Sequence, residues 1–302
     1  MSRINVGGQA VIEGVMMRGP ELLSTAVRTP SGEIVYRKQK ITPAKNRILK
    51  TPFLRGSAML MDALIIGIKE LTFSANQSEE TVEEQLTDKQ AVFTAIFSIG
   101  LGILMFIALP SLISNFIFSN NRVYSNLLEA GFRLIFFIAY IWLISFSKDI
   151  KRVYQYHGAE HKSIYAYENN EVLSVENCQK HTTLHPRCGT SFLLIVMFVS
   201  IITFSLMDFI LPVPNNIVEK ILTKVLLRIF FMPLIAGISY EIQRYSSKHL
   251  DNPFVKIFVG PGLQLQKITT KEPDDSQVEV AIVALKVALG ETVTNAREIE
   301  YS

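Results

Sequence analysis

Four apolar stretches, each long enough to cross a bilayer, limit the folds open to this chain. A hydrocarbon core of about 30 Å takes about 20 helical residues. The stretches cover residues 91–114, 127–147, 191–212 and 221–243. With 49% hydrophobic and only 19% charged residues, the chain is too apolar for an ordinary soluble protein. The sequence therefore predicts a membrane α-helical fold with four transmembrane helices, the first ended or kinked near Pro110.

Lys and Arg are distributed unevenly around these stretches. Residues 1–90 hold twelve, the connection 148–190 holds six and the tail after 243 holds seven, whereas the connections 115–126 and 213–220 hold one each. Basic residues concentrate on the cytoplasmic side of membrane proteins. The N-terminal sequence is polar and strand-like, without the pattern of a signal peptide. We therefore predict that both termini and the loop 148–190 are cytoplasmic.

Three further segments flank the membrane domain 91–243. Residues 1–55 are predicted to form a small β-rich unit, because STAVRT and EIVYRKQK flank the turn-forming PSGE. Residues 56–90 combine a short apolar helix with an acidic linker. This helix either lies at the membrane interface or partly re-enters the membrane, or it packs within the cytoplasmic domain. The tail 244–302 is predicted to be helical, with capping residues at 274–276 and a stop at Gly290.

Histidine and cysteine concentrate in the loop 148–190. Four of the five histidines and both cysteines lie within residues 157–188, namely His157, His161, Cys178, His181, His185 and Cys188. Apolar residues recur at steps of three and four around the sequence HGAEHK. This periodicity places His157 and His161 on the inward face of one helix, with Glu160 beside them.

Two imidazoles four residues apart on a helix can bind the same divalent ion. The order His-x-x-Glu-His resembles the inverzincin motif of zinc peptidases. By that analogy, His157 and His161 are zinc ligands and Glu160 is the general base. A catalytic zinc needs one more protein ligand and an open position for water. The candidates are Glu241, His181, His185 and Cys188, and the sequence leaves the choice open.

Two alternatives concern the same cysteines. Cys178-x-x-His181 and His185-x-x-Cys188 could form a structural Cys₂His₂ site, although only three residues separate the two halves. A disulfide between Cys178 and Cys188 is not expected in a cytoplasmic loop.

Three functional hypotheses follow. The first is a membrane zinc-dependent hydrolase acting on a membrane protein or a lipid-derived substrate. The second is a non-enzymatic scaffold with a structural metal or a His/Cys knot, and the third is a regulator that binds lipid or ions. A transporter is disfavoured because no ionisable residue lies near the middle of a predicted span. The lipid bilayer is the expected partner, and nucleic acid is not.

Four separated motifs resemble one family. GGQAVIEGVMMRGP, HGAEHK, HPRCGTSF and PGLQLQKITTKEPDDSQVEVAI are similar to segments of the YqhQ-like family of bacterial membrane proteins, a domain of unknown function. The resemblance covers nearly the whole chain. It implies a multi-pass protein of the bacterial cell membrane, and it assigns no catalytic residue.

Overall fold

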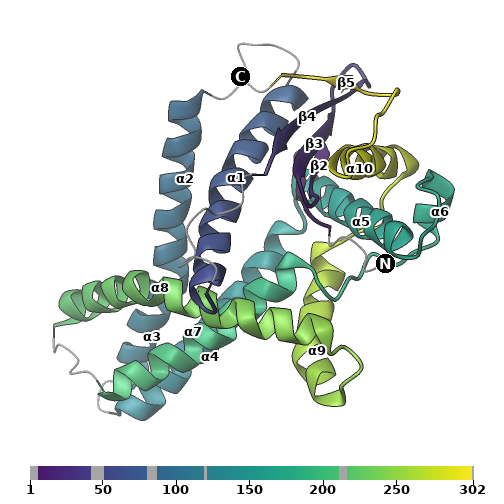
Figure 1. The fold of residues 1–302 in the computed structure, drawn as a ribbon. Coiled ribbons are helices and arrows are strands. Elements are labelled where there is room, and N and C mark those ends of the chain that lie inside the picture. Colours follow the sequence, from purple (N-terminus) through teal and green to yellow (C-terminus); the bar gives the residue numbers. More distant parts are fainter. Residues whose placement is uncertain (1–5, 42–50, 80–86, 119–120, 211–215, 301–302) are drawn as a thin grey trace.

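The computed structural model describes residues 6–41, 51–79, 87–118, 121–210 and 216–300 (Figure 1). Residues 80–86 of the predicted acidic linker lie outside the described residues.

A five-stranded sheet contains the N-terminal strands. Strands β1 (Gly7–Val11), β2 (Gly14–Arg18), β3 (Leu22–Arg28) and β4 (Ile34–Lys40) form an antiparallel meander in sequence order. The predicted hairpin around PSGE is confirmed as the β3–β4 turn, where Gly32 adopts a φ of 86°. Strand β5 (Arg297–Glu298) comes from the C-terminal tail and pairs parallel with β4.

Helices cover both faces of the sheet (Figure 1). Val15 and Met17 of β2 pack against α5 (Lys148–Glu168) and α10 (Asp275–Ala288). Met16, between them in sequence, points the other way, to a cluster beside Ile66 of α1 (Leu54–Ser78). This alternation follows from the period of two in a strand, and it makes both faces of the sheet apolar.

Helix α10 is the predicted tail helix. Asp274 caps it through a reciprocal pair of hydrogen bonds with Gln277, and Gly290 follows its end with a φ of 83°. The helix is buried on almost every side because it lies between the sheet, α5 and the short helix α6 (Val175–Gln179).

Helix α1 is amphipathic. On its inner face, Glu70 accepts a hydrogen bond from Arg37 of β4, and Phe73 packs on the sheet. Its outer face exposes large apolar side chains, namely Met61, Leu64, Ile65, Ile68 and Leu71. The inner face of α1 therefore packs on the N-terminal sheet, and the helix also packs against α8 (Ile217–Lys248).

Four helices or helix runs in the described part of the chain are long and apolar enough to cross a membrane. They are α2 (Asp88–Ile103) continued by the π-helical turn η3 (Leu104–Ala108) and α3 (Leu109–Ile117), then α4 (Arg122–Ile144), α7 (Gly189–Ile210) and α8 (Ile217–Lys248). Each predicted stretch falls on one of them. Pro110 does not end the first run, but it directly follows the π-helical turn, an irregularity of the kind that accommodates a proline within a helix.

A buried charge cluster joins two of these helices. Glu129 of α4 contacts Arg133 of the same helix together with Lys224 and Arg228 of α8. The helices α7 and α8 also pack together, and α9 (Pro253–Thr269) packs against α7. Helix α9 leads from the end of α8 back toward α5, and it completes the surroundings of the His/Cys loop.

Candidate metal centre

Helix α5 presents His157 and His161 on one face, one turn apart. His157 Nδ1 lies 2.8 Å from the carbonyl oxygen of Thr269, at the end of α9. His161 Nδ1 lies 2.5 Å from the carbonyl oxygen of Thr183, in the loop after α6. A carbonyl only accepts hydrogen bonds, so each Nδ1 is the protonated nitrogen and each Nε2 keeps its lone pair. Fixing a histidine tautomer in this way is typical of metal ligands.

Cys188 completes the group. Its Sγ lies 3.1 Å from His157 Nε2, and ligand atoms of His157, His161 and Cys188 all lie within 4.8 Å of one another. In a tetrahedral zinc site, bonds of about 2.0–2.3 Å place ligand atoms about 3.3–3.7 Å apart. Small side-chain movements are therefore enough to bring the three atoms onto one ion.

Two polar atoms beside this group are buried without a hydrogen-bond partner in the described part of the chain. They are His161 Nε2 and Glu160 Oε2. Glu160 is only 5% exposed, and burial raises the pKa of its carboxyl to about 8. Unsatisfied buried polar atoms are rare, and an unseen ion or water explains many of them. A cation held here would satisfy His161 and favour the charged form of Glu160.

The protonation states of His161 and Cys188 also suit metal binding. Burial lowers the pKa of His161, which keeps this imidazole neutral near pH 7. Burial opposes ionisation of the Cys188 thiol, whereas contacts of its sulfur with the Thr190 backbone N–H and hydroxyl favour the thiolate and so lower the thiol pKa. A neutral imidazole and a thiolate are the forms that bind metal.

The structure places the other candidate ligands elsewhere. Glu241 accepts hydrogen bonds of 2.7 and 2.5 Å from the Arg55 guanidinium. His181 Nε2 lies 3.0 Å from a Glu171 carboxylate oxygen. Neither Glu241 nor His181 belongs to the His/Cys group found among the described residues.

His185 and Cys178 are also held away from that group. The His185 ring lies near that of His161, with centroids 5.5 Å apart, but its Nε2 is 3.5 Å from Glu168. Cys178 packs in the core beside α10, and both cysteines are free. The described residues therefore do not assemble the Cys₂His₂ site.

The surroundings of Cys178 predict an unreactive thiol. Burial, aided by the Glu171 carboxylate, raises its pKa to about 11. Since the thiolate is the reactive form, alkylation of folded protein at pH 8 should be at least about a hundredfold slower than that of unfolded protein. Peptide-resolved mass spectrometry after iodoacetamide treatment measures this rate, and equal rates in folded and unfolded protein would contradict the burial.

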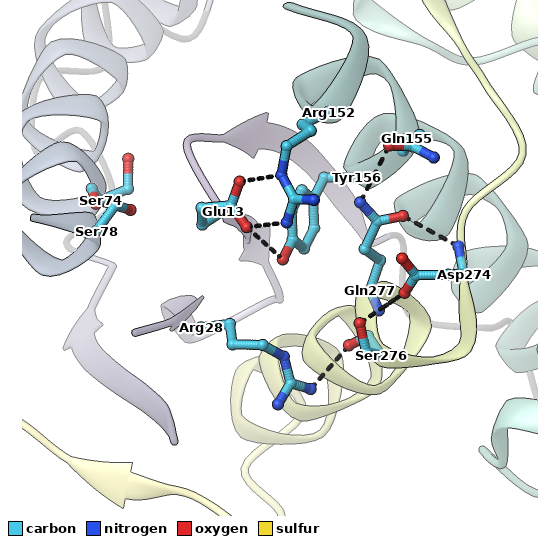
Figure 2. A network of polar contacts seen from close by, with 10 residues as sticks. All are labelled: Glu13, Arg28, Ser74, Ser78, Arg152, Gln155, Tyr156, Asp274, Ser276 and Gln277. Carbon is cyan, nitrogen blue, oxygen red and sulfur yellow. Dashed lines mark hydrogen bonds and ion pairs between the residues drawn. The ribbon is translucent and has the colours of Figure 1, made fainter. Parts of the chain in front are cut away.

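A polar network fixes the β1–β2 hairpin to α5 (Figure 2). Glu13, in the β1–β2 turn, contacts the Arg152 guanidinium with both carboxylate oxygens and lies 3.3 Å from the Tyr156 hydroxyl. Arg152 and Tyr156 lie on α5, just before His157. This attachment holds β1 against the helix that bears the candidate ligands.

Gly8 of β1 consequently lies directly against Glu160. A Cβ atom at Gly8 would be 2.9 Å from Glu160 Oε1 and 2.7 Å from the Met16 carbonyl oxygen, whereas a Cβ at Gly7 would meet nothing within 4 Å. This role of β1 was not predicted from the sequence. The Gly7-Gly8 pair was its only local signal, and a glycine pair does not identify the helix it will contact.

The two glycines provide a matched pair of variants. Gly8→Ala is expected to push β1 away from α5, because its Cβ would meet the Met16 carbonyl and Glu160. Disturbing the helix that bears the candidate ligands should weaken zinc binding about tenfold or more. Gly7→Ala is expected to bind zinc like the wild type. Competition with a chromophoric chelator measures both affinities, and equal affinities for the two variants would contradict the tight approach of β1 to Glu160.

A pocket of about 810 Å³ opens in front of this group. His157, Glu160, Cys188 and Thr190 are among the polar residues that line it. Strands β1, β2 and β3, helices α1 and α5 and the ends of α4, α7 and α9 supply the rest of the lining, which is mostly apolar. A water or a substrate group in this pocket would therefore reach His157, Glu160 and Cys188 together.

Comparison with known proteins gives a family and a relative. Residues 51–291 match a family described as "Protein of unknown function (DUF1385)". The chain is 38% identical over 294 residues to a Bacillus subtilis (strain 168) protein named "Uncharacterized protein YqhQ", covering 91% of this chain and 89% of that one. No solved structure matches the chain.

Proposed function

Because the chain belongs to the DUF1385 family of proteins of unknown function, we propose its activity from its own geometry: it is a metal-dependent hydrolase of the membrane. The observation that favours this function most is the buried group of His157, His161 and Cys188 beside a Glu160 oxygen that has no hydrogen-bond partner among the described residues. His157, Cys188 and Glu160 all line one open pocket. A purely structural zinc site has four protein ligands and no pocket.

Zinc is the metal that this donor set suits best. Two imidazole nitrogens and a thiolate are ligands that Zn²⁺ accepts in tetrahedral geometry. Three protein ligands would leave a fourth position for water, and two of the three, His157 and Cys188, line the pocket. The Thr269 and Thr183 carbonyl groups fix the two imidazoles from behind, as the hydrogen-bond partners of zinc-bound histidines do in zinc enzymes.

In the proposed reaction, water adds to a carbonyl carbon or phosphorus of the substrate. A zinc ion held by His157, His161 and Cys188 would lower the pKa of the attacking water and polarise the group under attack. Glu160 takes the water proton and passes it to the leaving group as the bond to the leaving group breaks. A bound cation keeps Glu160 ionised for this role, against the effect of burial on its pKa.

The proposed location is the bacterial cell membrane, with both termini and the metal centre on the cytoplasmic side. Four apolar helices long enough to span a bilayer support a membrane protein. The excess of Lys and Arg in residues 1–90, 148–190 and the tail after 243 supports this orientation. Cysteine-accessibility labelling of single cysteines placed in 115–126 and in the tail would test it in intact cells.

The hydrolase proposal can be tested before the substrate is identified. Reconstituted protein is incubated with membranes from cells lacking it, in water enriched in the heavy oxygen isotope. Wild-type protein should generate products that carry one heavy oxygen, and the double variant His157→Ala/His161→Ala should generate none. Identical product profiles for the two proteins would overturn the proposal.

A further inference from the structure

The pocket in front of the candidate metal centre is polar only in part of its lining. Its apolar wall includes Met59, Ala63 and Ile66 of α1, Ile141 of α4, Leu193 of α7 and Leu265 of α9. Gln9 and Arg18 also line it, and the Arg18 guanidinium is already bound to Asp62 at 2.8 Å. A ligand that lies against this apolar wall therefore contacts few protein groups that could form a hydrogen bond with it.

The pocket opens onto apolar surface. Met59 and Leu193 line it and are nevertheless 46% and 51% exposed. Leu193 lies in the first turns of the candidate membrane span Gly189–Met207, and Ile141 lies near the end of the span Val123–Ile144. The pocket mouth is therefore continuous with the side chains that would face lipid at one end of these spans.

Two other lining side chains are almost fully buried. Leu23 of β3 and Leu265 of α9 line the pocket but are only 1% and 6% exposed. Molecules that merely surround the protein do not reach these side chains. A chain entering from the membrane would pass Met59 and Leu193, reach Leu23 and Leu265, and place its polar end beside Glu160 and Cys188.

We propose that the pocket takes an acyl chain of a bilayer lipid and holds the ester end of that lipid at the metal centre. An acyl chain needs no hydrogen bonds, so it fits an apolar wall better than a peptide, whose backbone groups would lose theirs on entry. The assignment of this lipid as a substrate rests on the proposed hydrolase function. Binding of the lipid in the pocket does not, so the two can fail separately.

Photocrosslinking tests the binding. The protein is reconstituted in nanodiscs containing a phosphatidylglycerol that carries a diazirine in the middle of one acyl chain, and labelled residues are mapped by mass spectrometry. The expected result is label on Leu23 and Leu265. Label confined to exposed residues such as Phe146 and Ile202, which are 67% and 60% exposed, would overturn the proposal.

Two neighbouring substitutions on α1 provide the control. Ala63 lines the pocket, whereas Leu64 does not and is 51% exposed. Ala63→Trp should abolish the label on Leu23 and Leu265, and Leu64→Trp should leave it unchanged. Equal labelling of the two variants would overturn the proposal. So would label on Leu23 and Leu265 when a diazirine-bearing apolar peptide replaces the lipid.

Zinc content and heavy-oxygen incorporation measured on the same samples separate the two proposals. A sample that holds zinc and hydrolyses membrane material, but shows no label on Leu23 and Leu265, contradicts the acyl-chain pocket alone. A sample that shows the label but has neither zinc nor hydrolysis contradicts the hydrolase alone.

Discussion

Replacing Cys188 with alanine is expected to remove zinc from the purified protein. Its sulfur lies 3.1 Å from His157 Nε2, and it is the residue that brings a thiolate to the two imidazoles of α5. Loss of a single supporting group around a zinc site costs about 10–100-fold in affinity. Loss of one of only three protein ligands should cost more, so His157→Ala and His161→Ala should have the same effect.

The other cysteine supplies the control. Cys178→Ala removes a buried thiol from the core beside α10, away from the candidate ligands. This variant should retain one zinc per chain, as measured by mass spectrometry of metal content after gel filtration. If Cys178→Ala lost zinc while Cys188→Ala retained it, the metal would lie elsewhere in the loop, and the assignment of Cys188 would be wrong.

Replacing Glu160 with glutamine is expected to separate binding from catalysis. Glutamine keeps the size of the side chain but cannot accept the proton of the attacking water. General bases contribute about 10²–10⁴-fold in rate, so heavy-oxygen incorporation should fall by that factor while zinc content stays unchanged. The exposed residue Glu176, paired with Lys180 four residues along the chain, offers a matched control in Glu176→Gln.

The opposite outcome would favour a different function. If Glu160→Gln hydrolysed membrane material like the wild type, Glu160 would not be the base. If neither protein hydrolysed anything while both held zinc, the metal would be structural and the protein a scaffold. Buried carboxyl groups can also serve folding alone, so thermal unfolding of both variants should be compared before activity is interpreted.

The local part of the site was predictable from sequence. His157, Glu160 and His161 lie within two turns of one helix, so their common face follows from helical periodicity. The capped helix α10 was predictable for the same reason, because Asp274 and Gly290 mark its two ends within the sequence itself.

The distant part was not predictable. Cys188 is separated from His157 by 31 residues, and only the return of the loop toward α9 distinguishes it from His181 and His185. Glu241 was a reasonable candidate until its partner was known, and that partner, Arg55, lies 186 residues away. Contacts between residues so far apart in the chain depend on tertiary packing. No local pattern in a single sequence indicates them.

Two elements of the tail were also not predicted from the sequence. Helix α9 contains Pro261 and two glycines, which locally disfavour a helix. The structure places Gly262 against Ser191, where a Cβ would lie 2.5 Å from the hydroxyl oxygen, so close packing on α7 requires glycine there. Strand β5 contains two residues, too few for a period-two pattern to emerge.

Zinc K-edge X-ray absorption of the purified protein tests the central claim most directly. With zinc bound by His157, His161 and Cys188, the spectrum should show one sulfur at about 2.3 Å and nitrogen or oxygen neighbours at about 2.0–2.1 Å, including imidazole scattering. The sulfur contribution should disappear, or the zinc should be lost, in Cys188→Ala. Protein that binds no zinc, or zinc with no sulfur neighbour in the wild type, would contradict the proposed metal centre.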